Sequence, residues 1–199
     1  DATGTVLLDG DDVTALSTVD RRARGMGYIS EDRHRDGIVL PLALRENAVL
    51  GYQQLPPVRR GPWFRRSAAA RAAAEIIAAY DVRGGDPSTR ASALSGGNQQ
   101  KFIVGRELLR EPRLLLAAHP TRGVDIGAQA AIWSELVAAR DRGLATLLVS
   151  ADLDEILALS DRVLVLHRGR IVAEIDARGA DVGTIGEYMT GARGEEAAA

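Results

Sequence analysis

The residues best suited to chemistry lie at positions 94–101, where the chain reads LSGGNQQK. Ser95 offers a hydroxyl donor, and Gly96 and Gly97 lack the Cβ atom that would keep an anion away from backbone N–H groups. The amphipathic run at 102–110 continues this segment as a helix. Because a helix start attracts negative charge through its free N–H groups and its dipole, the segment is predicted to clamp a phosphate. A helix start that bound nothing would not require two glycines.

The elements that must position this segment follow an α/β order. Before it, strands are expected at 5–10 and 26–30, helices at 44–50 and 67–80, and an irregular surface segment at 53–66. After it, we expect a strand at 114–118, a helix at 127–140, a strand at 145–150, a helix at 152–159 and a strand at 162–167. This alternation predicts a parallel sheet with covering helices. A strand at 171–175 should form a hairpin with 162–167, and a short helix is expected near 185–189.

Composition restricts the class of protein. The chain has 199 residues, of which 46% are hydrophobic and 26% charged, as expected for a globular domain with one sizeable core. No stretch reaches the roughly 18 apolar residues of a membrane span, so we expect a soluble chain in the cytoplasm. It has no cysteine and only three separated histidines, which argues against disulfides and a structural metal site. The net charge of −2 gives no broad surface for nucleic acid.

Several motifs in one order resemble those of the ATP-binding cassette (ABC) family, from Gly4 to about Thr190. Residues 94–99 are similar to the family's LSGGQ signature, and we call residues 94–101 the signature segment. Residues 27–33 (GYISEDR) stand at the Q-loop, 114–121 (LLLAAHPT) at the Walker B strand, 122–125 (RGVD) at the D-loop and 149–155 (VSADLDE) at the switch. The resemblance implies that two cassettes sandwich ATP, with the signature of one facing the P-loop of the other.

The departures from the family pattern fall on its catalytic positions. Ala118 and His119 stand where the resemblance implies the Walker B Asp and Glu, which hold magnesium and polarise water. Ala151 replaces the switch histidine, and Glu31 replaces the Q-loop glutamine. His119 could act as a base, although packing or capping is favoured over that role. No catalytic group is therefore expected to be intact, and no metal ligand is expected.

The printed sequence also contains no G-x-x-x-x-G-K-[ST] motif. We therefore expect one incomplete ABC-type nucleotide-binding domain over residues 1–199, of α/β class, with the P-loop absent. Its mostly parallel sheet and covering helices should occupy about 111–177, with a helical signature subdomain at about 41–110 and a short antiparallel β element. Residues 191–199 are expected to be a disordered tail.

The resemblance implies a site composed with a partner cassette. ATP with Mg²⁺, held on the partner P-loop, should meet this chain's signature and D-loop residues: Ser95, Gly96, Gly97, Asn98, Gln99 and Asp125. The chain would supply its signature in trans as a degenerate cassette. By itself it is predicted to be inactive as an ATPase.

Within the family, the chain looks like the second cassette of tandem-cassette ATPases in bacterial importers of simple sugars and nucleosides. The EDRH run at 31–34, Asn98 and the AAHPTRGVDIGA run carry this resemblance, and the latter is closer to the nucleoside branch. It implies a partner nucleotide-binding domain, membrane permease subunits, no nucleic acid, and a peripheral location on the cytoplasmic face of the inner membrane. A permease helix is expected to dock near 31–33. The alternatives are a soluble non-transport ABC protein and a structural or regulatory cassette without ATP chemistry.

One motif stands outside this picture. Arg59, Arg60, Arg65 and Arg66 flank the pair Trp63-Phe64. Aromatic rings interleaved with arginine can stack on bases or lie at lipid headgroups. An exposed loop or a permease contact is the favoured interpretation of this segment.

Overall fold

Three parallel strands form the sheet beneath the candidate site. In the computed structural model, which describes residues 3–192, the strands β3 (Met26–Ile29), β6 (Leu114–Ala118) and β7 (Ala145–Val149) pair in the order β3-β6-β7. Met26 is in register with Leu114, which is in register with Ala145. β6 is central because its run of leucine and alanine can be buried between neighbours, as in other parallel sheets.

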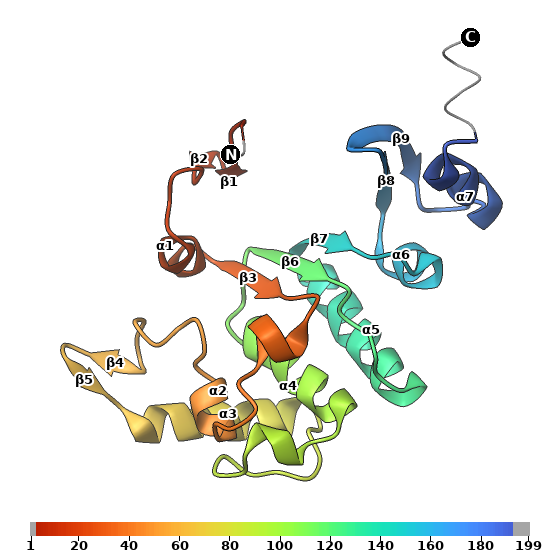
Figure 1. The fold of residues 1–199 in the computed structure, drawn as a ribbon. Coiled ribbons are helices and arrows are strands. Elements are labelled where there is room, and N and C mark those ends of the chain that lie inside the picture. Colours follow the sequence, from red (N-terminus) through yellow and green to blue (C-terminus); the bar gives the residue numbers. More distant parts are fainter. Residues whose placement is uncertain (1–2, 193–199) are drawn as a thin grey trace. The chain divides into compact units, whose positions relative to one another are not determined.

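The helices of the same unit of the chain, which ends at Val149, pack partly on this sheet and partly on one another (Figure 1). They are α1 (Thr18–Ala23), α2 (Leu44–Asn47), α3 (Arg66–Ala79), α4 (Gly96–Leu108) and α5 (Ile126–Asp141), together with the π-helical turn η1 (Arg33–Gly37) and the 3-10 turn η2 (Ala91–Ala93). The signature helix α4 contacts α3, α5 and β3. It buries Phe102, Ile103 and Val104, so the signature segment stands on the core of this unit.

Two short hairpins complete the first unit. β1 (Leu7–Leu8) pairs with β2 (Asp11–Asp12) across Asp9 and Gly10, whose positive φ angles suit a two-residue hairpin turn. β4 (Arg59–Arg60) pairs with β5 (Trp63–Phe64) just before α3. The sequence predicted an irregular segment at 53–66. That segment is exposed at its tip, as expected, but it contains this hairpin.

The second unit begins at Ser150. It contains α6 (Leu153–Leu159), β8 (Arg162–His167), β9 (Arg170–Asp176) and α7 (Val182–Thr190). The predicted hairpin is confirmed, because β8 pairs antiparallel with β9. The prediction that 162–167 belongs to the parallel sheet is wrong, since within residues 3–192 β8 pairs with β9 alone. The predicted tail at 191–199 lies mostly outside the described residues.

A buried carboxylate joins the elements of the first unit. Glu107 on α4 is 0% exposed, and its Oε2 accepts hydrogen bonds from Arg22 of α1 at 3.0 Å, from Tyr52 Oη at 2.6 Å and from the Tyr28 N–H of β3 at 3.2 Å. Arg106 Nε donates to Oε1 at 3.0 Å. A buried charge is tolerable when it is paired and hydrogen-bonded in this way. Glu107 therefore fixes α4 relative to α1 and β3.

Candidate nucleotide-contact site

Ser95 begins the site by capping the signature helix. Its backbone is extended (φ −64°, ψ 158°), and its Oγ accepts the Asn98 N–H at 3.4 Å. The N–H groups of Gly96 and Gly97 belong to the first turn of α4, which has no partners for them within the helix. The N-cap and the free first turn confirm that the signature segment opens a helix.

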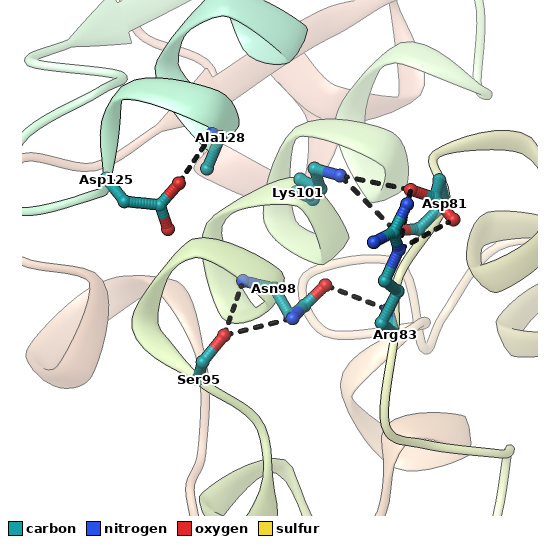
Figure 2. A network of polar contacts seen from close by, with 7 residues as sticks. All are labelled: Asp81, Arg83, Ser95, Asn98, Lys101, Asp125 and Ala128. Atoms are coloured by element: carbon teal, nitrogen blue, oxygen red, sulfur yellow. Dashed lines mark hydrogen bonds and ion pairs between the residues drawn. The ribbon is translucent and has the colours of Figure 1, made fainter.

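Asn98 fixes how the Ser95 hydroxyl is used (Figure 2). Asn98 Nδ2 donates to Ser95 Oγ at 2.9 Å, and Asn98 Oδ1 accepts the backbone N–H of Arg83 at 2.8 Å. The Arg83 N–H can only donate, so it determines which end of the Asn98 amide faces Ser95. A hydroxyl has two acceptor positions and one proton. Asn98 occupies both acceptor positions, which leaves the Ser95 proton available for an anion.

Two cationic side chains, Arg83 and Lys101, lie beside this network and share the carboxylate of Asp81. Arg83 Nε donates to Asp81 Oδ2 at 3.0 Å, and Lys101 Nζ lies 3.6 Å from the same oxygen (Figure 2). Lys101 Nζ also donates to the Asp81 carbonyl at 3.3 Å. The hydrogen bonds from Arg83 hold the pKa of the Asp81 carboxyl below its usual 3.8, so Asp81 is ionised at neutral pH. It orients one arginine and the chain's sole lysine next to Asn98.

These groups line a cavity of about 430 Å³ at the start of α4 and α5. Asp125 lies on its α5 side, where Oδ1 accepts the Ala128 N–H at 2.9 Å and caps the helix (Figure 2). The cavity is lined by Asp81, Arg83, Ser95, Gly97, Asn98, Lys101, Asp125, Gly127, Ala128 and Ala131. The structure thus brings together four of the residues that the sequence proposed for nucleotide contact: Ser95, Gly97, Asn98 and Asp125.

Gly97 is required by packing, independently of any ligand. A Cβ atom at this position would lie 2.9 Å from Ala128 Cβ and 2.9 Å from Asp125 Oδ2. Both distances are shorter than a normal van der Waals contact, so only glycine lets α4 and α5 approach this closely. The argument that a helix start without ligand would not need two glycines is therefore wrong at Gly97. Pattern alone could not show this, because Ala128 is distant in sequence.

The other two proposed contacts, Gly96 and Gln99, do not line the cavity. Gln99 is 5% exposed, and its Nε2 donates to the carbonyls of Ala91 and Leu94, both at 3.1 Å. Its Oε1 lies 2.9 Å from His34 Nε2. A Cβ on Gly96 would lie 3.0 Å from the Arg33 guanidinium. Both residues face the loop after β3 rather than the cavity.

Two residues of that loop, Glu31 and Arg33, bind the loop after β6. Glu31 forms an ion pair with Arg122. Arg33 donates to the carbonyls of Arg122 at 2.8 Å and Gly123 at 3.2 Å, while its Nε is buried without a partner in the described chain. Glu31, which replaces a glutamine of the family pattern, therefore has a charged partner within the chain.

The positions that the sequence aligns with the family's catalytic residues have few polar groups to offer. Ala118 ends β6 with a methyl group, and His119 follows it in the left-handed backbone region at φ 47°. The His119 N–H donates to the Val149 carbonyl at 2.8 Å, which places this residue in the turn after β6. Ala151 is exposed in the second unit, next to Asp152, the N-cap of α6. Within residues 3–192 no group of three or more His, Asp or Glu is arranged to hold a metal ion. The side chains at positions 118, 119 and 151 therefore do not fit magnesium, which prefers oxygen ligands.

Sequence reasoning missed Asp81 and Arg83. They lie 14 and 12 positions before Ser95 and reach it only because α3 packs against α4. It also missed Gln100, whose Nε2 donates to the Pro120 carbonyl at 2.7 Å and ties the signature helix to the turn after β6. The sole lysine, Lys101, was the one signal in the sequence that could have pointed to a charged partner nearby.

Comparison with known proteins agrees with these motifs. The profile of the family described as "ABC transporter" matches residues 1–122. The guanosine import ATP-binding protein NupO of Bacillus subtilis is 40% identical over 200 residues, covering 98% of this chain and 38% of NupO. The nucleoside import ATP-binding protein NupA of Lactococcus lactis and the ribose import ATP-binding protein RbsA of Chromobacterium violaceum are each 39% identical over 188 residues, covering 94% of this chain and 37% of theirs. The chain thus spans less than two fifths of these relatives.

Solved structures show the same fold. An ATP-binding cassette in a dimeric post-hydrolysis state with ADP and Pi superposes with a TM-score of 0.70 at 20% identity, covering 89% of this chain and 75% of that one. A transporter cassette in its ADP conformation gives 0.67 at 18% identity, covering 94% and 73%. The predicted α/β nucleotide-binding fold is confirmed.

Proposed function

Because the chain belongs to the ABC transporter family, we propose that it is an ATP-binding part of a bacterial importer of nucleosides or simple sugars. In this proposal it is the second cassette of a tandem pair and supplies its signature segment to ATP held on a partner cassette. The names of relatives at 39–40% identity support this class of transporter. Two of the three name nucleosides or guanosine, which favours the nucleoside branch.

The Ser95 hydroxyl is the observation that carries the proposal. With both acceptor positions occupied by Asn98, its proton can only be donated outward. The N–H groups of Gly96 and Gly97, Lys101 and Arg83 add positive potential nearby. A donor fixed in advance towards a terminal phosphate stabilises developing charge without reorganising.

The role of the chain's own sheet is different. The Ala118 methyl group cannot ligate a metal, and the described residues offer no carboxylate cluster in its place. We therefore assign the Mg²⁺ that accompanies ATP to residues of the partner cassette.

The remaining partners follow from the same proposal. The cassette lies peripherally on the cytoplasmic face of the inner membrane and binds permease subunits near residues 31–33. No helix within the described range is both long and apolar enough to span a bilayer. Ile126, at the first position of α5, is 84% exposed beside the cavity, and an apolar side chain there suits burial against a partner cassette.

The test uses the full transporter that contains this chain, with solute uptake and ATP turnover as the readouts. Ser95→Ala removes the donor, and both rates should fall on the order of a hundredfold. Asn98→Asp keeps an acceptor for the Arg83 N–H but cannot donate to Ser95. The Ser95 proton then turns to the carboxylate, and negative charge appears beside the phosphate, so a similar loss is expected.

Ser67→Ala on the exposed side of α3 is the matched control and should leave both rates unchanged. The thermal unfolding of each variant is measured alongside. If Asn98→Asp folds normally and transports at the wild-type rate, the signature segment does not contact phosphate through Ser95, and the proposed function fails.

A further inference from the structure

The β4–β5 hairpin presents aromatic rings and arginines to solvent. We call residues 59–66 the basic hairpin. Trp63 is 76% exposed and Phe64 47%, which is unusual for rings of this size. The hairpin is nevertheless anchored, because the Arg65 N–H donates to the carbonyl of buried Val58 at 2.8 Å. An ordered turn therefore holds the two rings away from the core.

The charge around these rings has one sign. Between Ala48 and Ala74 the chain has no Asp or Glu, yet it contains Arg59, Arg60, Arg65, Arg66 and Arg71. All five are exposed, and none forms an ion pair with any residue that the structure describes. The whole chain has a net charge of −2, so this segment is a local positive region on an otherwise acidic protein.

We propose that the basic hairpin docks on the anionic headgroups of a phospholipid membrane. Tryptophan is favoured at the level of the headgroups, where its ring is partly buried and its N–H stays hydrated. Each basic residue near an anionic leaflet adds attraction within about a Debye length. The hairpin would insert Trp63 and Phe64 between headgroups while its arginines bind lipid phosphates.

Charge favours lipid over a permease loop as the occupant of this surface. Cytoplasmic loops of bacterial membrane proteins have an excess of Lys and Arg, which would repel five unpaired arginines. Anionic lipid has the complementary sign. The contact uses none of the residues around Ser95, so it goes beyond the proposed nucleotide function and can be tested without nucleotide.

The experiment mixes the 199-residue chain with vesicles of phosphatidylcholine alone or with added phosphatidylglycerol, without ATP. Sedimentation measures binding. Tryptophan emission of the wild type minus that of Trp63→Phe reports the environment of Trp63. We expect binding only to the anionic vesicles, a blue shift of Trp63 and reversal by salt.

Charge-reversal variants give the decisive comparison. Arg60→Glu/Arg66→Glu should weaken vesicle binding by about 30-fold or more, since each basic residue near the surface contributes about fivefold. Glutamate at the start of α3 also suits the helix dipole, so the fold should persist. Arg168→Glu/Arg170→Glu makes the same charge change at the end of the β8–β9 hairpin, in its turn and at the first residue of β9, and should bind like the wild type.

Three results would overturn the proposal. The first is equal binding to neutral and anionic vesicles, or equal weakening by the two variants. The second is hairpin-dependent binding to a single-stranded oligonucleotide with no binding to lipid, which would assign the surface to nucleic acid. The third is binding to inverted bacterial membranes that is lost after protease treatment of those membranes, which would assign it to a protein. Failure of the Ser95 experiment would leave all these readouts unchanged.

Discussion

Gly97 shows how a packing requirement can account for a glycine that the sequence pattern assigns to ligand binding. The first turns of α4 and α5 meet at this position, where any Cβ would lie 2.9 Å from Ala128 Cβ. The same close contact places Asp125 and the signature segment in one cavity. A glycine in a signature motif is therefore weak evidence for phosphate contact by itself. Ser95, whose proton remains available, is stronger evidence.

The packing role of Gly97 predicts the outcome of a double-mutant cycle. Gly97→Ala should lower the free energy of unfolding by about 1–3 kcal/mol, because an added methyl group overpacks the contact. Ala128→Gly in the same chain should recover part of this loss by removing one of the two clashing atoms. Urea denaturation followed by circular dichroism measures all four proteins.

Gly186→Ala in α7 is the control, since a Cβ there meets nothing within 4 Å. It should be neutral or stabilising, because alanine favours a helix more than glycine does. A Gly97→Ala protein as stable as the wild type would contradict the packing argument.

At the scale of elements, the bounds of strands could be predicted from apolar runs in the sequence. The strand with which each of them pairs could not. The runs at 114–118 and 162–167 are strands with the predicted bounds, because continuous or alternating apolar residues favour a buried strand. The partner of β8 depends on contacts far along the chain, so the pattern assigned it to the wrong sheet. The β4–β5 hairpin has strands of only two residues, which are too short to produce a period.

The same limit applies to the site. Ser95, Asn98 and the first turn of α4 could be predicted because they are local. Asp81 and Arg83 could not, because their place beside Asn98 depends on the packing of α3 against α4.

The hydrogen bonds of buried Glu107, which fix α4 relative to α1 and β3, should contribute measurably to the free energy of unfolding. Tyr52→Phe removes the 2.6 Å hydrogen bond to Oε2 and should lower the free energy of unfolding by about 1.5–3 kcal/mol, the range for hydrogen bonds to charged groups. Burial, reinforced by the charge of Glu107, raises the pKa of Tyr52 above its ordinary 10.0. The folded state therefore holds this proton more tightly than the unfolded state.

The sign of the pH dependence follows from this raised pKa. The contribution of Tyr52 is complete below pH 10.0 and declines as pH rises towards its folded-state pKa. The difference in unfolding free energy between wild type and Tyr52→Phe should thus narrow above pH 10.0. Urea titrations below and above that pH measure it, and a difference that widens with pH would contradict the assignment.

At the scale of the whole molecule, the chain spans less than two fifths of its named relatives, and the function proposed for it requires a partner cassette and a permease. The ion pair between Glu31 and Arg122 offers a test of how solute uptake is coupled to ATP hydrolysis. Both side chains are more than half exposed, so the pair contributes little to stability. We expect the pair to act by holding the loop after β3 against the loop after β6.

Reversing the charge of Glu31 alone should therefore affect transport more than folding. Glu31→Arg is expected to shift stability by no more than about 0.5 kcal/mol while uncoupling uptake from ATP hydrolysis in the full transporter. The exchange Glu31→Arg/Arg122→Glu should restore coupling, because it rebuilds the pair. If the exchange restores nothing, Glu31 acts on the permease rather than on Arg122.

The contact between His34 and Gln99 has a consequence for proton location. The Gln99 Nε2 group is committed to two carbonyls, so its Oε1 faces His34 and can only accept. The His34 ring must therefore carry its proton on Nε2 when neutral, which selects one of the two imidazole tautomers. This hydrogen bond therefore fixes the tautomer and the orientation of the His34 ring, and it joins the loop after β3 to the signature helix.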